Sequence, residues 1–170
     1  ENFGNYPVEK FKETLKNISQ ESKLQLSKLG IRVGAKYFFT PNLLKKKQIE
    51  YCAILWKTFY QNNIDEFLPL PSNGRVSFSS KINMPDSYWQ SIGYINIKNF
   101  AFRIDVFEKI FFLARQKLKK GPFLESSDLM NPIGCNSNQL KDILTFCGYD
   151  YLIISDEKKL YFLSNKKKET

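Results

Sequence analysis

Histidine is absent from this sequence of 170 residues, and its absence excludes several kinds of chemistry. The chain cannot build a Ser-His-Asp triad or a Cys-His pair, and it lacks the commonest nitrogen ligand of zinc. It also contains no GxxxxGK[ST] segment, the pattern that cradles the phosphates of a bound nucleotide. We therefore expect a chain without catalytic residues, cofactor or metal.

Cysteine is scarce too, since Cys52, Cys135 and Cys147 form an odd set without CxxC spacing. We expect Cys135 and Cys147 to pack in or near the core, together with Met130 and Phe146. Long apolar runs are also missing, whereas a membrane span needs roughly 20 such residues in succession. Because no signal-peptide pattern is visible either, we expect a soluble, cytoplasmic protein that binds no membrane.

Arginine is rare, with only four among the 26 basic residues, yet abundant lysine brings the net charge to +9. This charge favours a polyanionic partner such as RNA or DNA, because lysine and arginine neutralise phosphates and release counterions. A solvated, lysine-rich surface explains the same charge balance, and composition alone leaves both interpretations open. A length of 170 residues is sufficient for one core or two small packed subdomains, and a hydrophobic content of 42% excludes a disordered tail.

The N-terminal third predicts a helix, a strand and a second helix. Residues 7–29 carry apolar side chains at steps of three and four, which predicts an amphipathic helix ended by Gly30. Residues 32–40 are β-prone, and their aromatic side chains belong either to a strand core or to a platform for stacking bases. Thr40 should then cap a helix over about 41–61. The apolar face predicted for this helix consists of Leu44, Tyr51, Cys52, Leu55 and Phe59.

Residues 66–86 contain three prolines and a Ser-Asn-Gly turn, which predict an extended connector with one short strand near 75–78. After it, Asp86 or Ser87 should cap a short helix ended by Gly93. The expected divisions of the chain are an N-terminal helix over 1–30, an α+β subdomain over 31–99, a C-terminal domain over 100–165 and a lysine-rich tail at 166–170.

The C-terminal third has the clearest pattern. Residues 103–120 predict a long helix, and Asn136 or Ser137 should cap another helix whose inward side chains end at Cys147. The elements expected around them are a strand at 123–124, a brief helix after Ser126 or Ser127, and a hairpin of strands 151–155 and 160–164. This order predicts a winged helix, that is, a helix-turn-helix plus a β-hairpin wing. The expected fold class is therefore α+β, with a mainly helical N-terminal subdomain that has short strands and a C-terminal winged helix.

A winged helix brings one helix to a groove of the nucleic acid and its hairpin to the flanking backbone. The side chains predicted to face the groove are Asn138, Gln139 and Lys141. The predicted phosphate contacts are Lys158, Lys159, Lys166, Lys167 and Lys168, and further candidates are Lys45, Lys46, Lys47 and Arg75. Because Asp142 shares the groove-facing side and this helix has no arginine, we expect binding without sequence specificity. The alternative is a protein-interaction or scaffold module.

Several short segments together carry a family resemblance. They are LGIRVG at 29–34, FTPNLLK at 39–45, GRVS at 74–77, IGY at 92–94, RIDVFE at 103–108, IGC at 133–135 and GY at 148–149. In this order they resemble the C-terminal accessory region of bacterial DExH-box helicases related to the mitochondrial RNA-degradosome helicase. The resemblance implies a region that guides RNA or DNA through an ATP-driven motor, or docks a partner, with the helicase ATPase core in the same or another chain. It transfers no catalytic residue, and it marks Arg75 and Arg103 only as pattern positions of unknown role.

Overall fold

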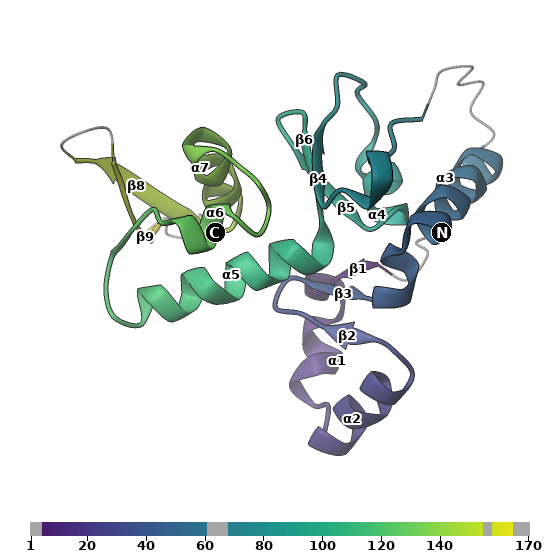
Figure 1. Ribbon diagram of the computed structural model, residues 1–170. Coiled ribbons are helices and arrows are strands. Elements are labelled where there is room, and N and C mark those ends of the chain that lie inside the picture. The colour runs from purple at the N-terminus through teal and green to yellow at the C-terminus, as the bar shows by residue number, and fades with distance from the viewer. Residues whose placement is uncertain (1–4, 61–67, 155–157, 165–170) are drawn as a thin grey trace, which may run out of the picture. The chain divides into compact units, whose positions relative to one another are not determined.

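The computed structural model describes residues 5–60, 68–154 and 158–164, and it has a mixed α+β fold (Figure 1). These residues form three antiparallel sheets of three strands each, and the α+β class expected from the sequence is confirmed. The chain divides into two compact units, Glu1–Glu108 (unit 1) and Lys109–Thr170 (unit 2). The division falls within helix α5 (Ile104–Leu118) rather than before residue 100.

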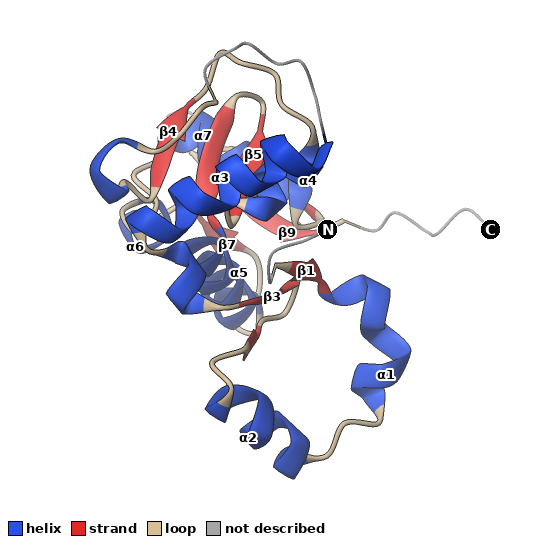
Figure 2. Ribbon diagram, turned by 90° about the vertical axis from the view of Figure 1, so that its right-hand side faces the viewer, coloured by secondary structure: helices blue, strands red, loops and turns tan. Residues whose placement is uncertain are grey.

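The first sheet of unit 1 has the strand order β1-β3-β2, formed by β1 (Tyr6–Pro7), β2 (Arg32–Val33) and β3 (Tyr37–Phe39). The β-prone run at 32–40 is therefore a hairpin and not one strand. Between β1 and β2 the chain forms the 3-10 turn η1 (Val8–Phe11), helix α1 (Lys12–Lys16) and helix α2 (Gln20–Lys28), which Figure 2 shows from the side.

The prediction of a single helix over residues 7–29 is wrong, because the helix is interrupted between α1 and α2. The Ser19 hydroxyl accepts a hydrogen bond from the Ser22 N–H at 3.1 Å and caps the start of α2, so a local side-chain bond replaces continuous helix. Neither helix has a buried residue. Instead, side chains that include Phe11, Leu15 and Leu26 line an apolar cavity of about 350 Å³.

The next element is the 3-10 turn η2 (Pro41–Leu44), followed by helix α3 (Lys46–Tyr60). Pro41 begins η2 as expected, but Thr40 makes no side-chain cap and Lys45 adopts an extended conformation that separates η2 from α3. The buried residues of α3 are Ile49, Cys52, Ala53 and Trp56. The predicted apolar face is correct for Leu44 and Cys52 and wrong for Tyr51, Leu55 and Phe59, which are exposed.

The second sheet of unit 1 has the strand order β4-β6-β5, with β4 (Ser77–Ser79), β5 (Tyr94–Ile97) and β6 (Phe100–Arg103). A two-residue turn with positive φ at Lys98 and Asn99 joins β5 to β6, so residues 94–100 contain a hairpin that the sequence pattern did not reveal. Helix α4 (Asp86–Ser91) precedes the hairpin and confirms the short helix ended by Gly93, but the cap expected at Asp86 or Ser87 is wrong, because Pro85 is the N-cap and makes no side-chain cap.

Buried aromatic residues fix the expected connector to the body of unit 1. Trp56, Tyr88, Trp89 and Tyr94 belong to its most buried side chains. Three of these donate to backbone carbonyls of the connector: Tyr88 Oη to Pro69 at 2.8 Å, Tyr94 Oη to Arg75 at 2.6 Å and Trp89 Nε1 to Met84 at 3.2 Å. Residues 68–86 are therefore part of unit 1, and burial raises the pKa of the Tyr94 hydroxyl to about 12.

Unit 2 begins with most of α5 and continues through β7 (Phe123–Leu124), α6 (Ser127–Met130), α7 (Ser137–Phe146), β8 (Tyr149–Ile153) and β9 (Lys159–Leu163). Each helix and strand expected here is present, with ends shifted by a few residues. The strand order is β7-β9-β8, and Tyr161 of β9 lies opposite both Phe123 and Tyr151.

The core of unit 2 lies between its helices and one face of this sheet. Its buried residues include Ile110, Ala114, Phe123, Leu129, Ile133, Leu140, Ile143, Leu144, Tyr149 and Tyr161. Cys135 and Cys147 are buried as expected, whereas Phe146 is half exposed and lies at the edge of this core. Across the described parts of both units, no helix is long and apolar enough to span a membrane.

Candidate nucleic-acid interface

Helix α7 begins at a pair of reciprocal side-chain caps. The Asn136 Oδ1 accepts from the Gln139 N–H at 2.9 Å, and the Gln139 Oε1 accepts from the Asn136 N–H at 2.9 Å. This capping box satisfies two backbone donors that a helix start otherwise leaves without partners. Its inward side chains are fully buried, so the opposite side of α7, with exposed Asn138 and Thr145, faces solvent.

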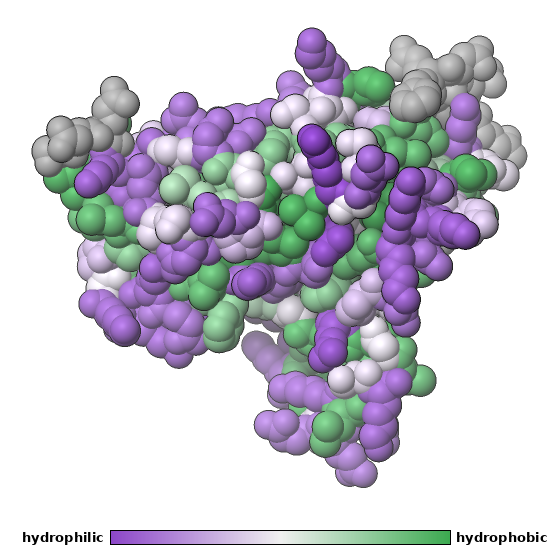
Figure 3. All heavy atoms as spheres, in the orientation of Figure 1, coloured by the Kyte–Doolittle hydropathy of each residue, from purple (hydrophilic) through white to green (hydrophobic). Residues whose placement is uncertain are grey.

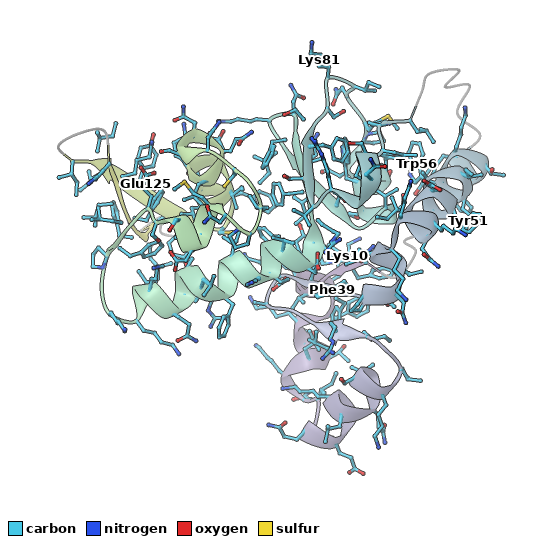
Figure 4. All side chains as sticks on the ribbon, viewed as in Figure 1. Lys10, Phe39, Tyr51, Trp56, Lys81 and Glu125 are labelled. Atoms are coloured by element: carbon cyan, nitrogen blue, oxygen red, sulfur yellow. The ribbon has the colours of Figure 1, made fainter. Side chains whose placement is uncertain are left out.

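A hydrogen-bonded chain of three side chains attaches the start of α7 to the sheet. The Lys159 Nζ donates to the Ser137 Oγ, and the Ser137 Oγ donates to the Glu125 Oε2 at 2.7 Å. Glu125, labelled in Figure 4, directly follows β7, and Lys159 begins β9. The three residues thus hold the α7 N-terminus against both strands.

This network changes the role expected for Lys159. The sequence predicts a phosphate contact there, but the side chain is only 9% exposed and its ammonium is engaged by Ser137. Lys159 lies on the same face of the sheet as Tyr161, two residues along β9, and that face packs on the core. We therefore leave Lys159 out of the candidate interface.

The other predicted residues of α7 differ in how freely they face solvent. Asn138 is exposed. Gln139 is half-buried, and its amide oxygen is occupied by the capping box. Lys141 is half-buried as well, with its Nζ 3.6 Å from the Asp142 Oδ1 and 6.0 Å from the centre of the Tyr151 ring. Its charge is therefore partly balanced within unit 2.

The remaining candidates of unit 2 lie at the hairpin and in the tail. Lys158 is exposed, and its carbonyl accepts from the Ile154 N–H at 2.8 Å, which closes the base of the β8–β9 loop. Lys166, Lys167 and Lys168 lie outside the described residues.

Three further basic residues that the sequence reading did not single out lie near the end of α5. Arg115, Lys119 and Lys120 are exposed, while the neighbouring Lys117 pairs with Asp128 at 3.0 Å. Arg115 lies in the last turn of α5, where the helix dipole favours cations, so its presence has a local explanation as well. The signal that would have found them is the cluster of basic residues immediately before Gly121.

The candidates of unit 1 are exposed but belong to different elements. Lys45, Lys46 and Lys47 surround the start of α3, and Arg75 follows the 3-10 turn η3 (Ser72–Gly74). Arg103 instead makes a two-pronged contact with Asp105 at 2.7 and 2.9 Å, and the hydrogen bond to this carboxylate raises the pKa of the guanidinium. Its side chain therefore stabilises the start of α5.

The described residues offer little reactive chemistry. Burial raises the pKa of the Cys52 thiol and raises that of Cys135 to about 11, so both remain protonated and poorly nucleophilic near neutral pH. Within residues 5–60, 68–154 and 158–164, no group of three or more Cys, Asp or Glu side chains is arranged to hold a metal ion. Comparison with protein-family models, curated proteins and solved structures found no match for this chain.

Proposed function

We propose that α5 and the elements after it form a winged helix that binds RNA or DNA, within a non-catalytic accessory region of a nucleic-acid helicase. The observation that carries this proposal is the element order α5, β7, α6, α7, β8, β9 combined with the strand order β7-β9-β8. A helix-turn-helix followed by a β-hairpin has this order, and such modules present the second helix and the hairpin to nucleic acid.

The contacts that the proposal requires come from exposed polar and cationic side chains. Asn138 on α7 and Lys158 at the hairpin are the principal ones, and Lys119 and Lys120 are further exposed cations of unit 2. Lys141 contributes less, because Asp142 lies beside it. Since α7 has no arginine, the usual reader of guanine, we propose contacts with the phosphate backbone and no base reading.

The helicase context rests on the resemblance of the segments between residues 29 and 149. In that context the chain helps to guide RNA or DNA through a motor supplied by the same or another chain. Lys45–47 and Arg75 are additional candidate phosphate contacts in unit 1, where all four are exposed.

Fluorescence anisotropy with labelled single-stranded and duplex RNA and DNA tests this function. We expect micromolar binding to several sequences alike, weakened by about tenfold to a hundredfold between about 50 and 200 mM salt, as a few phosphate contacts predict. Absence of binding at the lower salt concentration would sink the proposal.

Charge-reversal variants locate the contacts. Lys141→Glu with Lys158→Glu should weaken binding about tenfold or more for all sequences. Lys23→Glu with Lys81→Glu is the matched control: both lysines are exposed in unit 1, and the net charge changes equally. Lys81 points into solvent in Figure 4. Equal losses in the two double variants would mean that net charge, and not this surface, governs binding.

A second candidate function, protein interaction, is favoured by three leucines that lie side by side on one face of the unit 2 sheet. Leu160 of β9 lies opposite Leu124 of β7 and Leu152 of β8. Leu124 is 45% exposed and Leu152 is 60% exposed. An apolar row of this kind is typical of a face that another protein covers. It would dock a helicase core or a nuclease partner.

Two double variants distinguish the two candidate functions. Leu124→Gln with Leu152→Gln should leave nucleic-acid affinity unchanged under the leading proposal. Under the second, the same double variant should abolish co-purification of a partner that persists after nuclease treatment, while Lys141→Glu with Lys158→Glu should have no effect on it.

A further inference from the structure

Helix α3 has two apolar faces, and only one of them packs on unit 1. Ile49, Cys52, Ala53 and Trp56 are buried against the core. The other face carries Tyr51, Ile54, Leu55 and Phe59, which are 62%, 59%, 50% and 57% exposed. Since each residue turns an α-helix by about 100°, the centres of the two faces lie roughly 140° apart. In Figure 4, Trp56 lies on the α4 side of the helix and Tyr51 on its outer side.

The exposed face has the geometry of a helix-packing surface. The spacing from Tyr51 to Ile54, Leu55 and Phe59 is three, four and eight residues, which makes one continuous stripe along the helix. A helix that is apolar on nearly all sides is normally covered on all sides. Single exposed apolar residues are ordinary, but four adjoining large ones form a patch of the kind that marks an interaction site.

The charges around the stripe indicate what covers it. Lys47 is exposed at its N-terminal end, and Lys46 and Lys57 lie on one flank; Glu50 is the one acidic residue of α3. Lys45 adds an exposed charge directly before the helix. Figure 3 shows hydrophobic surface at the position of α3 beside strongly hydrophilic side chains. An apolar stripe with a basic rim is complementary to an acidic amphipathic surface.

The same charges argue against a parallel pair of α3 helices from two copies of this chain. In such a pair, Lys46 and Lys47 of one copy would face the same residues of the other, and like charges brought together disfavour that pairing.

The stripe is also poorly suited to a nucleic-acid strand. Ile54 and Leu55 occupy its middle, and aliphatic side chains provide no ring on which a base can stack. A phosphate backbone would need cations along the whole path, whereas the two exposed lysines of α3 lie at one end.

We propose that the outer face of α3, formed by Tyr51, Ile54, Leu55 and Phe59 with Lys46 and Lys47, binds an acidic amphipathic helix of a protein partner. The partner's apolar residues, spaced three and four apart, pack along the stripe, and its carboxylates pair with the lysines at the N-terminal end of α3. This site lies within unit 1, where it assigns Lys46 and Lys47 to a protein partner instead of to phosphate, and it does not rest on the nucleic-acid contacts proposed for unit 2.

The test measures binding of three labelled synthetic peptides of about 20 residues to the full chain by fluorescence anisotropy. The first is an amphipathic helix with leucines on one face and mainly glutamate elsewhere. The second keeps the leucines and replaces glutamate with lysine. The third has the composition of the first with the leucine spacing scrambled. We expect the first to bind at least about tenfold more tightly than either of the others.

Variants of the chain assign the binding to α3. Tyr51→Gln with Leu55→Gln should weaken the acidic peptide at least about tenfold, because both side chains lie at the centre of the stripe. Leu24→Gln with Leu29→Gln is the matched control, since these residues of unit 1 are at least as exposed, at 62% and 74%, and belong to α2 and its C-cap. Lys46→Glu with Lys47→Glu should reverse the preference toward the lysine peptide.

Four outcomes would overturn the proposal. They are no binding of the acidic peptide, equal binding of the scrambled peptide, unchanged affinity in the Tyr51→Gln, Leu55→Gln variant, and self-association of the chain that this same variant abolishes. Circular dichroism of each variant confirms that the fold is retained, which the exposure of both substituted side chains leads us to expect.

Discussion

The contacts that stabilise the inside of each unit differ in how far apart in the sequence their residues lie. In unit 2, the start of α7 is fixed by Asn136 and Gln139, three residues apart, and Gly148, which follows the C-cap Cys147, adopts a positive φ. In unit 1, the turn between β2 and β3 is fixed by the carboxylate of Glu108, more than 70 residues away. A local contact therefore fixes this helix start in unit 2, and a distant contact fixes this turn in unit 1.

The Glu108 contact is the clearest example of a distant contact. Its Oε2 accepts from the Ala35 N–H at 2.7 Å, and its Oε1 accepts from the N–H groups of Lys36 and Tyr37 at 2.8 and 2.7 Å. A Cβ at Gly34 would lie 2.4 Å from the Glu108 Cδ, so only glycine leaves room for the carboxylate. The Glu108 side chain of α5 thus determines the shape of the turn between β2 and β3, and it also requires glycine at position 34.

The largest effect should come from the buried face of α3. Trp56→Ala removes a fully buried side chain that packs on Tyr88, with ring centres 5.2 Å apart, and donates to Ser87. We expect it to lower the free energy of unfolding of unit 1 by about 4 kcal/mol. Phe59→Ala on the exposed face of the same helix should cost less than about 0.5 kcal/mol. Hydrogen exchange of α3 and α4 peptides measures both, and similar losses would contradict the assignment of faces.

The next largest effect should come from Glu108. Glu108→Ala leaves three part-buried N–H groups without their acceptor, and we expect a loss of about 3 kcal/mol in the stability of the 32–39 hairpin. Glu108→Gln should lose less, because the amide oxygen can still accept from Lys36 and Tyr37, although its NH₂ group then faces the Ala35 N–H. Hydrogen exchange of amides 35–37 is the direct measurement.

A double-mutant cycle with Gly34 tests whether the steric fit is real. Gly34→Ala should cost about 2 kcal/mol in the natural chain, because its methyl group collides with the carboxylate. In the Glu108→Ala background the same substitution should cost much less, since that space is then empty. Additive effects would mean that Gly34 is not required by Glu108.

The difference between the units also explains how much could be predicted from the sequence. In unit 2, the cap at Asn136, the inward stripe ending at Cys147 and the stop at Gly148 are all local signals, and the corresponding elements are confirmed. Lys159 was misplaced because the second strand of the hairpin was expected to begin one residue later. Including it in β9 puts Lys159 on the inner face with Tyr161.

In unit 1, periodicity could not choose between the two apolar faces of α3. The face with Tyr51, Leu55 and Phe59 satisfies helical spacing as well as the face with Ile49, Cys52 and Trp56 does. The choice is made by α4, which supplies Tyr88 and Ser87 as partners for Trp56. Likewise, the sequence of residues 68–86 contains no signal that the hydroxyl groups of Tyr88 and Tyr94 will donate to backbone carbonyls of this segment.

The smallest predicted effect compares one cap in each unit. Asn136→Ala should cost about 1 kcal/mol in the stability of α7, because this helix buries its inner face in the core and the Gln139 N–H loses its acceptor. Ser19→Ala removes an equivalent cap from α2, but this helix has no buried residue and its side chains border an apolar cavity. We therefore expect faster hydrogen exchange within α2 with almost no change in the thermal unfolding of the rest of unit 1. Ser19→Ala could instead lower the stability of the core around Trp56 as much as Asn136→Ala lowers the stability of unit 2. In that case α2 would unfold cooperatively with the rest of unit 1, and the contrast between the two caps would be wrong.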